Sequence, residues 1–370
     1  HKQHRIRVKN RGKTPNKHWK IPKKHETAYR RVTEIVDGQT LISEITKRRA
    51  EDIVDQIALL PANTAKFRGK EVSFILENCH EDESRFSPKN TNDYIDMYIS
   101  LFEYAIDNDH YKWKNPFSSP DLKLRDKKKS SKRDQFEKHE LKKIFEGDWF
   151  TNYSVKGVGL KHGFKPHQYW APLIALYTGA RNNEIGSLYL KDIKKSEELT
   201  RNGQELWYFD INDESNDKKV KTENANRKTP IHPKLIQLGL LEYKKVLENE
   251  GETMLFGYLP YDSHNGYGRL IGEHFNDYLK EIGVYKAYKK VFYSFRHTVN
   301  SYLTRAKVHP IHREAICGRS TGQTTLGDEN YTSDTTLRPV DLYDDVLTLD
   351  FEDVLQEVKP FFEMETKIKH

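Results

Sequence analysis

Arg181, an arginine at a break between two apolar segments, is the first residue whose type and position could do chemistry. The apolar run from Trp170 to Tyr177 predicts a buried helix, and Gly179 predicts its end, because glycine can leave a helix without steric strain. A helical apolar pattern resumes after Arg181. A guanidinium at the mouth of such a turn is suited to binding a phosphate, since its planar fork of donors matches phosphate oxygens. A salt bridge from Arg181 to Glu184 is the alternative interpretation.

Three further positions in the second half of the chain carry charged or reactive side chains. Lys221 lies in the first of two segments, 218–222 and 227–231, that predict a β-hairpin, where a lysine often serves only to protect a strand edge from aggregation. Tyr293 and Arg296 are three residues apart and share one face if the segment is helical. Tyr331 follows Gly and Asn residues that predict a loop or a helix start. The chain has 21 tyrosines, so its position alone does not distinguish Tyr331 from a structural tyrosine.

In chain order, these positions lie in segments that resemble the motifs of the tyrosine recombinase (phage integrase) family. The segments are Thr178-Gly-Ala-Arg181-Asn-Asn-Glu184-Ile with Asp192-Ile193, Lys221-Thr222 with Arg227 and Pro230-Ile231, Phe295-Arg296-His297-Thr298, and Cys317-Gly318-Arg319-Ser320 with Tyr331. Residues 87–116 are similar to the helical core-binding domain of the family, so the resemblance covers about residues 30–345. Two positions depart from the pattern: Tyr293 stands where the family usually has His, and Arg319 where it usually has His or Trp.

The resemblance implies chemistry on a DNA phosphodiester. Attack on phosphorus concentrates negative charge on the non-bridging oxygens, which arginines would stabilise. Tyr331 would be the nucleophile and leave a 3′-phosphotyrosine, while Lys221 would protonate the leaving 5′-oxygen. No nucleotide-binding signature or metal-ligand spacing is present in the sequence, so we expect neither a cofactor nor a metal. The expected catalytic residues are Arg181, Lys221, Tyr293, Arg296, Arg319 and Tyr331, with structural support from Glu184, Asp192 and His297.

Positive charge is concentrated in three stretches, residues 2–31, 123–132 and 218–228, and the net charge is +7. Such stretches in a chain with 12% aromatic residues predict a polyanionic partner, although each could also be ordinary solvated surface. Together with the resemblance, these basic stretches indicate that the partner is double-stranded DNA. The residues expected to contact DNA are Lys123, Arg125, Lys127, Lys128, Lys129, Lys132, Arg133, Lys218, Lys219, Arg227 and Lys228.

Apolar spacing predicts a mainly α-helical chain with a small antiparallel sheet, an α+β fold. Helical patterns occupy residues 25–60, 66–79, 88 to about 108 and 136–145, and residues 206–211 predict a strand. The expected organisation is a two-domain DNA clamp. It comprises a basic flexible arm (1–24), a SAM-like helical core-binding domain (25–120), a basic interdomain linker (121–133), a catalytic domain (134–346) and a C-terminal helix or tail (347–370).

The expected function is that of a site-specific recombinase that integrates or excises a mobile element. A catalytically impaired DNA-binding protein of the same fold and a type IB topoisomerase-like enzyme are the alternatives. We expect a homotetramer on DNA, in which an amphipathic helix over Leu347 to Phe362 docks onto a neighbouring protomer, and possible help from a directionality factor or a host DNA-bending protein. No apolar run approaches the ~20 residues of a membrane helix. The lack of such a run and the presence of only two cysteines, Cys79 and Cys317, far apart in the chain, predict a cytoplasmic, bacterial nucleoid-associated protein without a membrane partner.

Overall fold

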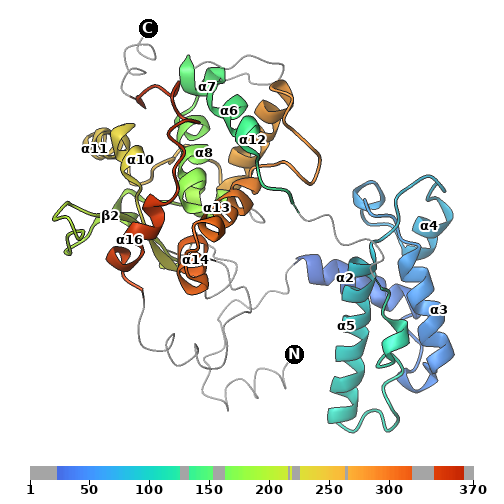
Figure 1. Cartoon of the computed structure of the whole chain (residues 1–370). Helices are drawn as coiled ribbons and strands as arrows, with labels where there is room; N and C mark the ends of the chain where they lie inside the picture. Colours follow the sequence, from blue (N-terminus) through green and yellow to red (C-terminus); the bar gives the residue numbers. More distant parts are fainter. Residues whose placement is uncertain are drawn as a thin grey trace. The chain divides into compact units, whose positions relative to one another are not determined.

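Two compact units make up the chain, and they divide between Ser130 and Ser131 (Figure 1). The computed structural model describes residues 23–125, 133–152, 163–215, 217–218, 226–262, 266–318 and 337–361, without the side chains of 23–27 and 65. In these ranges no helix is both long and apolar enough to cross a membrane.

The first unit is built from helices. They are α2 (Lys23–Ile35), α3 (Lys47–Ala58), α4 (Val72–Glu77) and α5 (Pro88–Asp107), with short 3-10 turns at Ile42–Glu44, Ala65–Phe67 and Pro120–Leu122. α5 begins as the sequence predicts, because Ser87 Oγ accepts the Asn90 N–H at 3.2 Å and proline is tolerated in the first turn. Its buried face packs on α2 and α3, and the Tyr98 ring stacks on Phe117 at 4.5 Å. The unit therefore has its own hydrophobic core.

The chain stays on the first unit well beyond α5. Leu122 is buried in the core of this unit, and the Leu124 N–H donates to Asn92 Oδ1 at 2.9 Å. The beginning of the predicted linker over 121–133 thus packs on the first unit. Residues 126–132 lie outside the described ranges.

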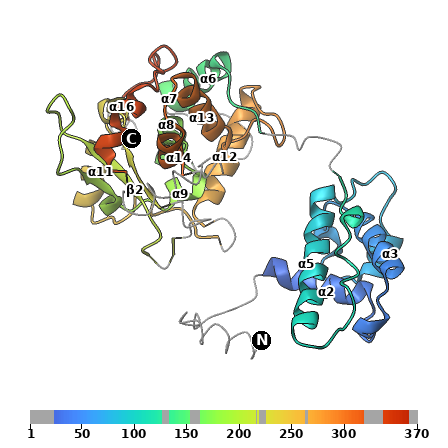
Figure 2. The ribbon, with the colours of Figure 1, turned by 60° about the horizontal axis from the view of Figure 1, so that its bottom comes forward.

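The second unit surrounds one buried helix, α8 (Pro166–Thr178), which lies in its middle in both ribbon views (Figures 1 and 2). Every residue of α8 from His167 to Thr178 is buried, as the apolar run predicts. Around it lie α6 (Lys138–Phe145), α7 (Asp148–Thr151), α9 (Asn182–Gly186), α10 (Pro233–Gln237), α11 (Leu240–Asn249), α12 (Gly268–Glu281), α13 (Ser294–Arg305), α14 (Pro310–Cys317) and α16 (Pro339–Leu347).

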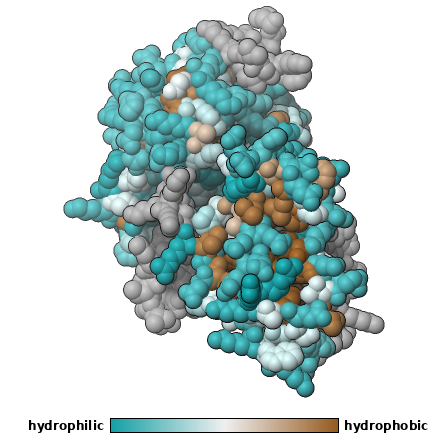
Figure 3. All heavy atoms as spheres, turned by 90° about the vertical axis from the view of Figure 1, so that its right-hand side faces the viewer, coloured by the Kyte–Doolittle hydropathy of each residue, from teal (hydrophilic) through white to brown (hydrophobic). Residues whose placement is uncertain are grey.

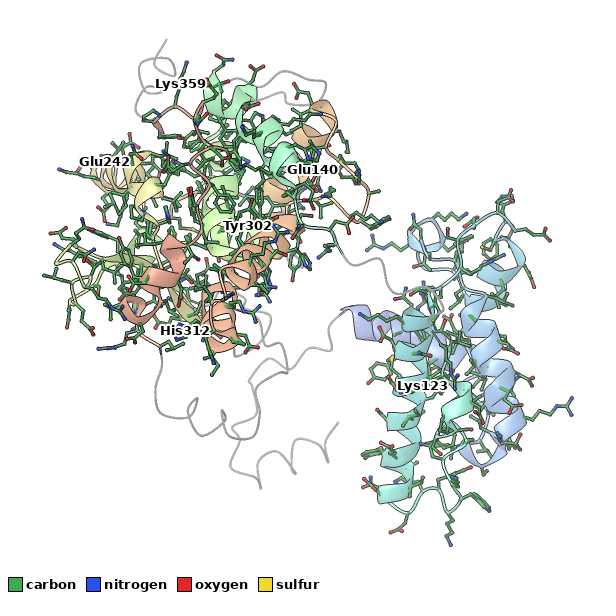
Figure 4. All side chains as sticks on the ribbon, viewed as in Figure 1. Lys123, Glu140, Glu242, Tyr302, His312 and Lys359 are labelled. Atoms are coloured by element: carbon green, nitrogen blue, oxygen red, sulfur yellow. The ribbon has the colours of Figure 1, made fainter. Side chains whose placement is uncertain are left out.

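A three-stranded antiparallel sheet completes the second unit, in the order β1 (Ile193–Lys195), β2 (Trp207–Ile211), β3 (Arg227–Pro230). The predicted strand over 206–211 is confirmed as β2. Phe209 pairs with Ile193 on one side and with Thr229 on the other, and all three side chains are buried. α14 and α16 pack against β3, and His312 Nδ1 of α14 lies 2.6 Å from Asp345 Oδ2 of α16 (Figure 4).

The predicted C-terminal helix over 347–362 is wrong. α16 ends at Leu347, and residues 348–361 run through turns without forming an α-helix. Their apolar side chains enter the core of the same unit, where the Phe361 ring lies 5.2 Å from that of Trp170. Tyr169 Oη also donates to Lys359 O at 2.6 Å. The segment therefore packs on its own protomer, which removes the reason to expect it on a neighbour.

The surface is mostly hydrophilic, with hydrophobic side chains grouped in patches (Figure 3). Exposed large side chains on the first unit include Tyr29, Leu41, Leu59, Phe74 and Trp113. Such patches identify no partner by themselves.

Candidate active site around Arg181 and Arg296

A rigid turn after α8 presents Arg181. Gly179 ends the helix in the left-handed conformation, with φ 60°, as the sequence predicts. Thr178 Oγ1 donates to Ile174 O at 2.7 Å and accepts the Ala180 N–H at 3.1 Å. Arg181 then caps α9, so two packed helices fix the backbone on either side of it.

Glu184 joins two arginines. Its Oε2 accepts the backbone N–H of Arg181 at 2.9 Å, which closes the first turn of α9, and its Oε1 accepts from Arg181 Nη1. Oε2 also accepts from Arg227 Nη2 of β3 at 2.9 Å. The salt bridge considered as an alternative for Arg181 is therefore present. The Arg181 side chain nevertheless keeps 20% of its surface exposed, whereas Glu184 and Arg227 keep 3% and 4%.

Arg296 of α13 is buried and binds two backbone carbonyls. Its Nη1 donates to Gly179 O at 3.0 Å, and its Nη2 donates to Gly318 O at 2.6 Å. These glycines follow the last residues of α8 and α14 in left-handed conformations, so the guanidinium lies at the negative ends of two helices. A side chain at Gly179 would lie 3.2 Å from Cys317 Sγ. Glycine therefore allows the close approach of these segments.

The electrostatics of this group favour an anion. Burial lowers the pKa of Arg296 to about 10, and the positive charges of Arg181 and Arg227 add to this effect, although the side chain stays charged at neutral pH. Burial alone would raise the pKa of Glu184, but Arg227 and Arg181 outweigh burial and lower it to about 2. One carboxylate thus faces three guanidiniums, and within the described ranges no carboxylate pairs with Arg296. An arriving anion would reduce this repulsion.

The ring of Tyr293, the residue immediately before α13, is in contact with a further arginine. The Arg133 guanidinium lies over its ring at 4.5 Å, and the His297 ring lies 5.5 Å away. The backbone next to Arg133 is fixed, because the Asp134 N–H donates to Lys289 O at 3.1 Å. Arg133, which was predicted to contact DNA, therefore lies beside a predicted catalytic residue.

Two residues predicted to contact DNA are buried instead. Arg227 donates to Glu184 and, through Nε, to Ile316 O at 3.1 Å. Lys218 Nζ donates to Asp192 Oδ2 at 2.6 Å, and the lysine side chain is 3% exposed. We correct both predictions, since a cation must be exposed to reach a DNA phosphate.

The other predicted residues divide between the exposed surface and undescribed ranges. Lys123 is exposed and pairs with Asp96 at 2.6 Å (Figure 4), while Arg125 and Lys228 are exposed. The remaining predicted residues lie outside the described ranges, and they are Lys127, Lys128, Lys129, Lys132, Lys219, Lys221, Arg319 and Tyr331.

Sequence reasoning missed several residues that build the site. The carbonyls of Gly179 and Gly318 hold Arg296, but a carbonyl leaves no signal in residue type. Around Lys218, Tyr189, Asp217 and Tyr267 form a hydrogen-bonded group that no motif indicated. In the part of the chain that is described, no three His, Cys, Asp or Glu side chains are grouped to hold a metal ion.

Comparison with solved structures tests the fold. The integrase of transposon Tn1549 (residues 82–397), in complex with circular intermediate DNA, matches with a TM-score of 0.50 and 17% identity, covering 93% of this chain and 98% of that chain. The chain has an integrase fold. It is the fold of the tyrosine recombinases, which the sequence resembles, and the predicted mainly helical class with a small antiparallel sheet is confirmed.

A second solved structure is also similar to this chain. Lambda integrase (residues 75–356), as a dimer bound to a core site, gives a TM-score of 0.49 and 14% identity, covering 87% of this chain and 94% of that chain. No family model and no curated protein matches the sequence.

Proposed function

We propose that this chain is a site-specific DNA recombinase that cleaves and rejoins DNA through a phosphotyrosine. The observation that carries the proposal is the group of Arg181, Arg227 and Arg296 around the single carboxylate of Glu184. Arginine has five N–H donors, and the two carbonyls bound by Arg296 occupy two of them. Arg181 is partly exposed and also keeps donors. Arg181 and Arg296 are therefore suited to binding the non-bridging oxygens of a phosphodiester.

In the proposed reaction, Tyr331 Oη attacks phosphorus and the bond from phosphorus to the 5′-oxygen breaks. The products are a 3′-phosphotyrosine and a free 5′-hydroxyl, whose proton comes from the Lys221 ammonium. The phenol proton passes to water, either directly or through the Tyr293 hydroxyl, which would release its own proton to water in turn. Rejoining reverses these steps, so the bond energy is stored in the covalent intermediate. Arg181 and Arg296 stabilise the charge that develops on the oxygens, where removal of one donor typically costs ~3–4 kcal/mol.

Double-stranded DNA is the proposed substrate, held by both units in a cytoplasmic, nucleoid-associated protein. The Tn1549 integrase structure contains DNA, which supports this choice of substrate together with the exposed Lys123, Arg125 and Lys228. Most contacts would be to phosphates, so affinity should fall steeply as salt rises. Recombination joins two duplexes, and we propose a tetramer on DNA that works with a directionality factor or a host DNA-bending protein. The proposed domains are 25–124 and 134–361, which extend the predicted limits of 120 and 346, because Leu122 and Phe361 are buried in the cores of the two units.

Covalent capture tests the function without knowledge of the natural site. A library of nicked duplexes with a randomised core is incubated with the protein, and adducts that survive denaturation are recovered and sequenced. The wild type should enrich one duplex, and Tyr331→Phe should yield no adduct. Tyr285→Phe, at a partly buried tyrosine of the same unit, is the matched control and should behave as wild type.

Other outcomes support the alternatives. Binding of one duplex without any adduct would indicate a DNA-binding protein that has lost catalysis. Adducts without sequence preference, together with relaxation of any supercoiled plasmid, would indicate a topoisomerase-like enzyme.

A further inference from the structure

A tight turn over residues 286–290 lies between α12 and α13 of the second unit. The backbone N–H groups of Lys289 and Lys290 both donate to Lys286 O, at 2.9 and 2.8 Å, so the chain reverses within five residues. Residues 286–289 are all exposed, whereas Lys290 is buried. The turn therefore has its tip in solvent and its end anchored in the unit.

Tyr288 occupies the tip of this turn in a strained conformation. It is 82% exposed, and its φ of 61° lies in the left-handed region, which a bulky side chain rarely adopts because its Cβ crowds the backbone. The side chain makes no hydrogen bond and no ring contact with any described residue, so no such contact offsets the strain. Strained residues of this kind cluster at functional sites. A large ring held out in this way indicates contact with a partner.

The end of the turn is fixed to the helix that carries Arg296. Lys290 Nζ donates to Glu140 Oε2 of α6 at 2.5 Å, and both side chains are buried. Lys289 O accepts the Asp134 N–H at 3.1 Å and the hydroxyl of Ser294, the first residue of α13, at 2.9 Å. The tip is thus held in a defined place relative to α13.

Positive charge without a strong partner surrounds the tip. Arg133 precedes Asp134 directly and lies over the Tyr293 ring at 4.5 Å, while Lys286 and Lys289 belong to the turn itself. Among the described residues no carboxylate pairs with Arg133 or Lys286. Lys289 Nζ lies 4.0 Å from Asp134 Oδ2 with both side chains about half exposed, and such a pair contributes little. The surface beside Tyr293 is therefore suited to an anionic partner.

We propose that the 286–290 turn and Arg133 bind the DNA backbone next to the phosphodiester at the active site. The inference rests on the proposed function for its substrate, double-stranded DNA. Arg133, Lys286 and Lys289 contact successive phosphates, and the Tyr288 ring packs against a deoxyribose between them. The match is chemical, because the DNA backbone alternates anionic phosphates with less polar sugars, as the turn alternates cations with a ring.

The salt dependence of DNA binding tests the three cations. Binding of the full chain to a fluorescently labelled duplex of mixed sequence is measured by anisotropy over a series of salt concentrations. Each phosphate contact contributes about 0.9 to the slope of log affinity against log salt, so Arg133→Ala, Lys286→Ala and Lys289→Ala should each lower the slope by about that amount. Lys245→Ala is the matched control and should keep the wild-type slope. Lys245 is exposed on α11, which lies across α8 from α12 in both ribbon views (Figures 1 and 2).

Two substitutions at Tyr288 separate contact with DNA from support of the fold. Tyr288→Gly removes the ring and should weaken binding by about tenfold, with the salt slope unchanged because no charge is lost. The same variant should melt at the wild-type temperature or above it, because glycine adopts the left-handed conformation without strain. Tyr288→Phe keeps the ring and should bind within about twofold of wild type.

Each other outcome overturns a definite statement. Wild-type slopes in all three cation variants would show that the turn does not bind DNA, and wild-type affinity in Tyr288→Gly would remove the ring from the contact. A lower melting temperature together with weaker binding in Tyr288→Gly would show a structural role instead. A wild type that binds no duplex removes the proposed substrate. A wild type that binds DNA but forms no adduct in covalent capture removes the recombinase activity and leaves this surface intact.

Discussion

At the scale of single residues, Arg181 and Arg296 differ in the groups that their guanidiniums bind. Arg181 binds the carboxylate of Glu184, whereas Arg296 binds two carbonyls that carry only partial negative charge. Arg296 therefore brings an uncompensated positive charge into a buried place. The buried Nε of Arg296 also has no hydrogen-bond partner among the described residues. A buried charge that is paired with carbonyls and with no carboxylate is costly, which is the physical reason to expect an anion here.

Replacing Arg296 by lysine tests this reasoning. Lysine keeps the charge but cannot bind Gly179 O and Gly318 O while also forming a planar fork to phosphate. We expect Arg296→Lys to slow adduct formation on the captured duplex by about 10²–10³-fold. Arg305→Lys, at the exposed end of the same helix, is the matched control and should keep the wild-type rate. Equal rates in the two variants would contradict a role of Arg296 in binding the phosphate.

The pH dependence of stability should report Glu184. Its pKa is lowered from 4.5 to about 2 in the folded state, so between these values the unfolded state binds the proton more readily. Stability from this group is therefore full above pH 4.5 and is lost as pH falls towards 2, by about 3 kcal/mol in total. In chemical denaturation between pH 5 and pH 3, Glu184→Gln should show a smaller loss of unfolding free energy than wild type. Glu242→Gln, at an exposed residue (Figure 4), should follow the wild-type curve, and parallel curves for all three proteins would contradict the prediction.

At the scale of elements, α9 is positioned by close contact between its first residues and the start of α12. A side chain at Gly268 would lie 2.5 Å from the Asn183 backbone nitrogen, and Asn182 Nδ2 donates to Gly268 O at 2.8 Å. Such backbone contact leaves no room for adjustment. The helix after Arg181 is thus held from the side as well as by its own cap.

Gly268→Ala should therefore separate α9 from α12. We expect it to lower the unfolding free energy by about 1–3 kcal/mol and to slow adduct formation, because Arg181 moves with α9. Gly272→Ala, one turn later, meets only the flexible Asn182 amide at 3.1 Å and gains up to about 1 kcal/mol in helix propensity. Thermal or chemical unfolding of the two variants checks the difference. Equal stability would show that the α9–α12 contact can relax.

At the scale of the whole molecule, the second unit is closed by its last described residues. Phe361 N–H donates to Leu238 O at 2.9 Å, and the Phe351 ring lies 5.6 Å from that of Tyr177. The apolar side chains buried in this segment are Leu349, Phe351, Val354, Leu355, Val358 and Phe361. At about 1.5–3 kcal/mol each, they contribute as much as the 5–15 kcal/mol total stability of an ordinary domain.

Truncation after Val346 should consequently prevent folding of the second unit. Loss of cooperative unfolding and rapid proteolysis of residues 131–346 would be the measured result. Truncation after Phe361 retains the buried side chains and should leave the melting temperature close to that of the full chain. A folded product after truncation at Val346 that lacked only assembly on DNA would instead restore the docking role first expected for this segment.

The sequence by itself determined the features that depend on neighbouring residues. Ser87 before Pro88 starts α5, Gly179 ends α8, and the aromatic run over 206–211 forms β2, because caps and periodicity act within a few residues. The order of Arg181 and Arg296 in motif-like segments also indicated the fold correctly.

Only the tertiary structure decided which charges are buried. Lys218 and Arg227 lie in a basic stretch that is typical of surface, yet their carboxylate partners lie 26 and 43 residues away in the chain. The C-terminal segment likewise finds its partner in Tyr169, 190 residues before Lys359. Burial depends on which distant segments meet, and local spacing carries no information about such meetings.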